Sequence, residues 1–173
     1  LPDWETLPYD NFSPHQDIIS ERLTALYHLP QLNRGILVVS ITSLMHRLPP
    51  RQYISANSLD LQVGQKLSIE QIREQMVLAG YQAVETVFEH GEFAVRGSII
   101  DIYPMGSRLP FRIDLFDDQI DSLRKFDPET QRSDEQVDEI NLLPGREYPL
   151  NENGIAAFRN AFHESFDIDF RQC

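Results

Sequence analysis

Three aspartates stand close together where acid–base chemistry would be possible. Asp117, Asp118 and Asp121 lie within one short segment, and paired carboxylates can divide the roles of general acid and general base. Aspartates also favour turns, because their side chains bond to the neighbouring backbone there. No nucleophile with an adjacent base is evident in the sequence. The pattern therefore favours a solvated hairpin turn, and nothing in the sequence predicts catalysis.

The sequence lacks the residue patterns that are typical of metal, cofactor and nucleotide sites. His90 and Glu92 could offer at most two ligands on one strand face, and the other histidines are scattered. The single cysteine, Cys173, excludes an internal disulfide and a thiolate cage within this chain. Neither GxxxxGK[ST] nor GxGxxG occurs, so no known phosphate-binding loop is present. We expect no metal and no cofactor.

Two arginines and a phenylalanine have the composition of a protein-binding surface. Residues 111–116 alternate apolar and polar side chains, as a half-buried strand does. Arg112 and Phe116 then share the outward face. Arg96 precedes Gly97, where a bulge or a turn with positive φ would aim the arginine out of the ladder. Exposed aromatics near arginines are typical of interface hot spots, so Arg96, Arg112 and Phe116 are candidates for partner binding.

A purely structural interpretation of the same residues stands beside this one. Most strand aromatics belong to a core, so a helix or loop of the same domain would cover Phe116. Arg112 would pair locally with Asp114, and Arg96 would form a surface salt bridge worth at most about 1 kcal/mol. The residue pattern leaves both interpretations open.

The elements around these candidates predict an α+β unit over residues 57–145. Residues 90–127 read as short strands separated by turn residues, which is typical of an antiparallel meander. Before these strands, Ser68 and Gln71 form a capping box at the start of a helix, and Gly80 is the expected end of that helix. We therefore expect a mostly antiparallel sheet with one helix packed on it.

The flanking segments predict part of a second, α/β domain. Residues 35–41 are continuously apolar and β-branched, as in a strand buried within a parallel sheet. Ser13 as N-cap and Pro14 as first helical residue predict a helix before this strand. Thr42 can cap a short helix after it. We assign this segment to residues 1–56.

A third helix is expected to begin around residues 151–153. Its apolar face needs a partner, and the simplest one is residues 1–55. The middle unit would then be an insertion, which divides the chain into residues 1–56, 57–145 and 146–173. The face comprises residues that recur at helical spacing, namely Ile155, Phe158, Phe162 and Phe166.

Composition favours a protein partner over a nucleic acid. The 173 residues are 41% apolar, enough for a real core, and carry a formal charge of −12. That charge repels phosphate backbones. No apolar run approaches the length of a membrane span, and no signal pattern is visible at the start, so a cytoplasmic location is expected. A start without methionine and an end soon after a new helix suggest an excised fragment.

Two segments carry a family resemblance. FAVRGSIIDIYP at residues 93–104 and FRIDLFDDQID at residues 111–121 resemble a signature shared by UvrB excision-repair proteins and the Mfd family of transcription-repair coupling factors. Residues 3–10 and 90–93 are similar to the Mfd family specifically. In UvrB a long DNA-engaging β-hairpin lies before the first helix, whereas residues 9–12 here run directly into Ser13. The resemblance covers nearly the whole chain.

The resemblance implies a UvrB-homology module with no catalysis of its own. Residues 1–56 and 146–173 would belong to a degenerate RecA-like domain without a working nucleotide site. Residues 57–145 would be the inserted domain that binds UvrA. The family's UvrA-contacting arginine, arginine and phenylalanine fall on Arg96, Arg112 and Phe116. RNA polymerase, DNA and ATP would be bound by other modules of the parent protein.

A second hypothesis makes the chain part of a UvrB-like, nucleic-acid-dependent NTPase that contacts DNA directly through its arginines. The missing P-loop, the missing β-hairpin and the formal charge of −12 oppose this hypothesis.

Overall fold

A six-stranded sheet dominates the structure, a computed structural model that describes residues 1–7 and 10–166. Pro8, Tyr9, Cys173 and the end of the expected return segment lie outside the described residues. The elements, in chain order, are α1 (Gln16–His28), η1 (Leu29–Gln31), α2 (Ile41–Met45), α3 (Arg51–Ala56), β1 (Leu59–Gln62), α4 (Ile69–Leu78), β2 (Gln82–Ala83), β3 (Glu92–Arg96), β4 (Ile99–Ile102), β5 (Phe111–Phe116), β6 (Gln119–Phe126), β7 (Ser133–Val137), β8 (Glu139–Leu142) and α5 (Glu152–Phe166).

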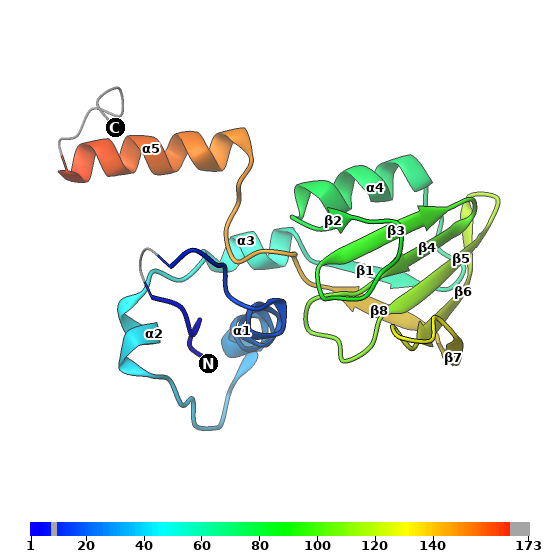
Figure 1. Ribbon diagram of the computed structural model, residues 1–173, viewed down its shortest axis with the longest axis horizontal. Coiled ribbons are helices and arrows are strands. Elements are labelled where there is room, and N and C mark those ends of the chain that lie inside the picture. The colour runs from blue at the N-terminus through cyan, green and yellow to red at the C-terminus, as the bar shows by residue number, and fades with distance from the viewer. Residues whose placement is uncertain (8–9, 167–173) are drawn as a thin grey trace.

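The sheet has the order β2-β3-β4-β5-β6-β7, and a separate two-stranded sheet pairs β1 with β8. All neighbours from β3 to β7 are antiparallel, and the short β2 is parallel to β3. Figure 1 shows this strand-rich part with α4 beside it, while α1 and α2 lie on the other side of the molecule. The expectation of an α+β fold with a mostly antiparallel sheet is confirmed.

The main core lies between one face of this sheet and α4. Ser68 caps α4 by accepting a hydrogen bond from the backbone N–H of Gln71, and Gly80 ends it with a φ of 93°. The Ser68 half of the predicted capping box and the stop at Gly80 are confirmed. Glycine suits the second position because it adopts this left-handed conformation without steric cost. The most deeply buried apolar residues of this core include Leu61, Ile72, Met76, Phe93, Ile100, Ile102, Ile113, Ile120 and Leu123.

Two tight hairpins form the meander that the sequence predicts. Gly97, with a φ of 61°, connects β3 to β4. Asp117 and Asp118 connect β5 to β6, and Asp117 has a φ of 58°. Lys66 lies 3.3 Å from the Asp118 carboxylate, and both side chains are exposed. The aspartates therefore form a solvated turn.

The predicted strand at residues 35–41 is wrong. Residues 35–40 form neither a helix nor a strand, Ile41 begins α2, and none of them joins a sheet in the described part of the chain. Its apolar side chains face solvent, with Ile36 91% and Val38 77% exposed. The amino group of Leu1 lies 2.8 Å from the Val38 carbonyl oxygen, and the Ser40 carbonyl oxygen accepts the Leu44 N–H of the next helix. A buried parallel strand needs neighbouring strands, and the described residues place none beside it.

Both predicted helix starts near the N-terminus are displaced. α1 begins at Gln16, with His15 rather than Ser13 as N-cap, because the His15 imidazole accepts a hydrogen bond from the Asp17 N–H. α2 is capped by Ser40, not Thr42, through the N–H of Ser43. In both cases a residue two positions from the predicted cap provides the acceptor instead.

α5 forms where the sequence predicts it, but the expected packing on residues 1–55 is wrong. None of its residues from 152 to 166 is buried, and Figure 1 shows the helix standing apart from α1 and α2. Phe158 and Phe166 are more than half exposed. Their rings follow one another along the helix with Phe162, at centroid distances of 5.8 Å and 4.7 Å. None of the described helices is long and apolar enough to cross a bilayer.

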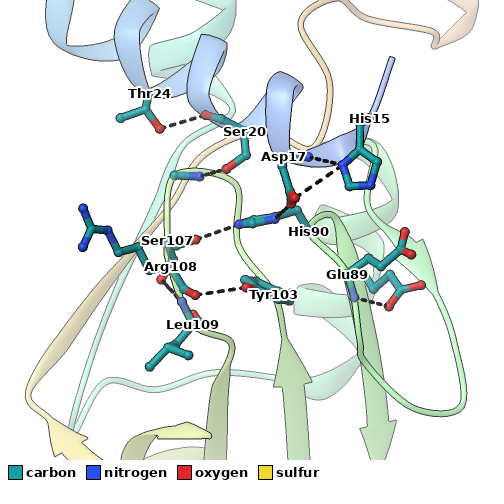
Figure 2. A network of polar contacts seen from close by, with 12 residues as sticks. His15, Asp17, Ser20, Thr24, Glu89, His90, Tyr103, Ser107, Arg108 and Leu109 are labelled. Atoms are coloured by element: carbon teal, nitrogen blue, oxygen red, sulfur yellow. Dashed lines mark hydrogen bonds and ion pairs between the residues drawn. The ribbon is translucent and has the colours of Figure 1, made fainter. Parts of the chain in front are cut away.

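The sheet is joined to α1 by a network of polar contacts around His90 (Figure 2). The His90 imidazole, 12% exposed, lies 2.7 Å from the Asp17 carboxylate and 2.7 Å from the Ser107 carbonyl oxygen. Gly106 donates its N–H to the Ser20 hydroxyl at 2.8 Å. The loop between β4 and β5 is thereby fixed against α1. Glu92, which follows His90 by two residues, accepts two backbone N–H groups of its own loop.

Candidate protein-binding surface

The three candidate residues share one face of the six-stranded sheet, opposite the face that α4 covers. We call this the outer face. Arg112 is paired with Asp101 of β4, and Arg96 is paired with Ile99 of the same strand. Cross-strand partners point to the same side, and so do alternate residues of one strand. Arg96, Arg112 and Phe116 therefore project from adjacent parts of the outer face.

Asp101 holds both arginines. Its carboxylate, only 1% exposed, accepts hydrogen bonds from the Arg112 Nε at 2.7 Å and Nη2 at 3.0 Å. Arg96 donates to the same carboxylate through its Nη2. The hydrogen bond to Asp101 raises the pKa of Arg112 above its already high ordinary value. Two guanidinium groups that would otherwise be mobile are thus fixed to one buried anion.

Arg112 has further contacts that fix its side chain against the neighbouring residues of the domain. Its Nη1 donates to the Gln131 carbonyl oxygen at 3.3 Å and to the Ser133 hydroxyl at 3.2 Å. Its guanidinium carbon lies 4.9 Å from the ring centroid of Phe126. The side chain is 18% exposed. The expected alternative, a pairing with Asp114, is wrong, because that carboxylate accepts the hydroxyl of Ser122 instead.

Arg96 and Phe116 are the accessible members of the trio. Phe116 is 78% exposed, and half of the Arg96 side chain is exposed. The alternative in which a helix or loop covers Phe116 is therefore wrong for the described residues. An uncovered phenylalanine at the end of a strand adds nothing to the core. Beside it, Arg96 can offer guanidinium donors that Asp101 leaves unused.

The role of Asp101 was not predicted. It stands in the segment that carries the family resemblance, but its two arginine partners come from different strands. Only the cross-strand register brings the three side chains together. A buried acidic residue within an apolar strand was the available signal, since a charge there demands a partner.

Other features of the described chain offer no comparable chemistry. Among residues 1–7 and 10–166, no group of three or more histidine, cysteine, aspartate or glutamate side chains could hold a metal ion. A cleft of about 670 Å³ lies between the N-terminal segment and the β2–β3 loop. Glu147 on its wall is already bonded to the Trp4 indole and to the Arg22 guanidinium. That carboxylate serves to tie the chain segments together.

Comparison with known proteins identifies relatives for most of the chain. The family model of the UvrB interaction domain matches residues 59–148, slightly more than half of the sequence. A transcription-repair-coupling factor of Haemophilus influenzae is 54% identical over 166 residues, which is 96% of this chain and 14% of the relative. The Escherichia coli protein of the same name is 51% identical over 97% of the chain and 15% of its own length. The chain thus spans about one seventh of these relatives.

Proposed function

The chain belongs to the UvrB interaction domain family, and on that premise we propose that it is a non-catalytic module that recruits UvrA in transcription-coupled nucleotide excision repair of DNA. Its relatives are named as factors that couple transcription to repair. In this proposal the chain makes the contact with the repair protein UvrA. RNA polymerase, DNA and ATP would be engaged by other modules of the parent protein.

The observation that carries the proposal is the exposure of Phe116 beside Arg96 on the outer face. Burial of a fully exposed phenylalanine against a partner is worth roughly 1.5–3 kcal/mol. A charge-assisted hydrogen bond from Arg96 to a carboxylate adds about 1.5–3 kcal/mol when it is desolvated. Arg112 would support this surface by holding Asp101 and would offer its exposed edge to the partner.

The proposal assigns different segments of the chain to two domains with different roles. Residues 57–145 form the UvrA-binding domain, and residues 1–56 and 146–173 belong to a degenerate RecA-like domain. The family match at residues 59–148 supports the placement of the binding domain. The exposed apolar side chains of residues 36–45 and of α5 support an incomplete flanking domain, since such surface is normally covered.

Calorimetric titration of purified UvrA with this chain tests the proposal. We expect Phe116→Ala and Arg96→Ala each to weaken binding at least about tenfold, which corresponds to about 1.4 kcal/mol. Arg73→Ala is the matched control, because Arg73 is exposed on α4, on the other side of the sheet. If both patch variants bind UvrA as tightly as the unchanged chain, the proposed site is wrong.

Direct DNA binding is the outcome that would favour the second hypothesis. A direct binder should retard a labelled duplex at low salt, and the retardation should disappear steeply as salt increases. We expect no retardation, because the formal charge is −12 and the Asp101 carboxylate partly neutralises Arg96 and Arg112.

A further inference from the structure

A pair of arginines on the outer face contradicts the usual rules of strand pairing. Arg112 on β5 is directly opposite Arg124 on β6. Like charges in this position are destabilising, because their side chains lie about 5 Å apart at the Cβ atoms. Arg112 is compensated by Asp101. The side chain of Arg124 is exposed and makes no hydrogen bond or ion pair within the described residues.

Two carboxylates on the strands beside β6 have other partners. Asp114, two strand positions from Arg112, accepts the Ser122 hydroxyl at 3.0 Å. Glu135 on β7 pairs with Lys125 at 2.7 Å. Arg124 thus makes no direct ion pair within the described residues, and it stands opposite another arginine, where a neutral residue would stabilise the sheet better. Such local conflicts are expected where a surface is selected for binding rather than for stability.

The position of Arg124 continues the surface proposed above. The outer face carries Arg96 on β3, Arg112 on β5 and Arg124 on β6, so cationic side chains extend across the sheet. The chain as a whole carries a charge of −12. Asp101 and Asp114 lie on the same face by the same register, so the arginines act as local positive charges on a negative molecule, and an exposed one attracts a carboxylate of an approaching partner.

We propose that Arg124 is a further partner-contact residue, which rests on the proposed function and extends the UvrA surface toward β7. It lies at the rim and attracts a carboxylate-bearing part of UvrA during association. Charges at an interface rim act mainly on the association rate and its salt dependence, whereas buried anchors act on dissociation. Arg124 should therefore differ from Phe116 in the kinetic step that it controls.

The test is the association kinetics of this chain with immobilised UvrA at several salt concentrations. We expect Arg124→Ala to slow association about threefold or more at low salt, with little change in dissociation. Arg124→Glu should slow it further, and both variants should show a weaker salt dependence. Arg73→Ala removes the same charge from α4 and should leave association within about twofold of the unchanged chain.

Stability measurements show whether a change in association comes from a lost contact or from a destabilised fold. Removal of an exposed arginine opposite another arginine should leave the urea midpoint unchanged or slightly higher. Unchanged association in Arg124→Ala, or equal slowing in Arg73→Ala, would overturn the inference. If Phe116→Ala still weakens binding in that case, the proposed function stands without Arg124. If Phe116→Ala and Arg96→Ala are also without effect, the proposed function itself fails.

Discussion

Asp101 and Arg112 face each other across β4 and β5, and two hydrogen bonds of 2.7 Å and 3.0 Å join them. The carboxylate is 1% exposed and the guanidinium 18%. Removal of one partner from a buried ion pair is strongly destabilising, because the other charge is left without compensation. Arg112 therefore contributes to stability as well as to the outer face.

The first prediction concerns Arg112→Ala. Asp101 would retain only Arg96, which is half exposed, so we expect a loss of about 2–4 kcal/mol in the free energy of unfolding. A merely solvent-facing arginine would instead change stability by no more than about 0.5 kcal/mol when it is replaced. Urea denaturation distinguishes the two expectations. A midpoint equal to that of the unchanged chain would show that the ion pair contributes nothing.

A second prediction tests whether Asp101 acts on partner binding through Arg96. Asp101→Asn removes the charge that holds the Arg96 guanidinium, so the side chain must be ordered when UvrA binds. Ordering one such side chain costs about 0.5–1.5 kcal/mol, and we expect binding to weaken about twofold to tenfold. In an Arg96→Ala background the same substitution should have a smaller effect, because only Arg112 then still depends on Asp101. Additive effects in this double-mutant cycle would contradict the positioning role.

A third prediction separates the two faces of β5. Ile113 is fully buried in the main core, and Ile113→Ala should cost about 2–5 kcal/mol of stability. Phe116→Ala, three residues along the same strand, should change stability by less than about 0.5 kcal/mol because Phe116 is 78% exposed. Urea midpoints of the two variants test this contrast. Comparable destabilisation by both would place Phe116 in the core.

A fourth prediction concerns the junction between the sheet and α1. The buried Tyr81 hydroxyl donates to the Leu143 carbonyl oxygen at 2.6 Å and accepts the Met105 N–H at 3.3 Å. Tyr81→Phe leaves both backbone groups without this partner and should cost about 1–3 kcal/mol. Thermal or urea unfolding at neutral pH measures the loss.

The same residue predicts a pH dependence at the alkaline end. Burial raises the pKa of Tyr81, so the folded state holds the phenolic proton more tightly than the unfolded state does. Stability from this source is complete below the unfolded pKa of about 10 and is lost as pH rises above it. The free energy of unfolding should therefore fall less steeply above about pH 10 in Tyr81→Phe than in the unchanged chain.

A fifth prediction addresses the proposed domain boundary. Residues 57–145 contain the main core and should give a dispersed amide NMR spectrum when produced alone. Met105 and Leu143 pack with Leu23 and Ile54 in a second core cluster, so the isolated unit should be less stable than the same residues in the full chain. A collapsed spectrum would contradict the independence of this unit.

Local rules explain what the sequence could predict. The cap at Ser68, the stop at Gly80 and the turn at Gly97 depend on the conformational preferences of single residues. The alternation in residues 111–116 determines which side chains share a face. Phe116 could therefore be placed on the same face as Arg112 before any tertiary contact was known, whereas its exposure could not be predicted.

Tertiary structure decided the partners of these residues. Nothing local indicates that Asp101 lies beside both Arg96 and Arg112, or that Arg124 faces Arg112, because each contact depends on the register between separate strands. The apolar run at residues 35–41 is a local pattern that the tertiary structure does not follow. Its composition is that of a buried strand, yet burial requires a neighbouring surface, and the described chain leaves it exposed.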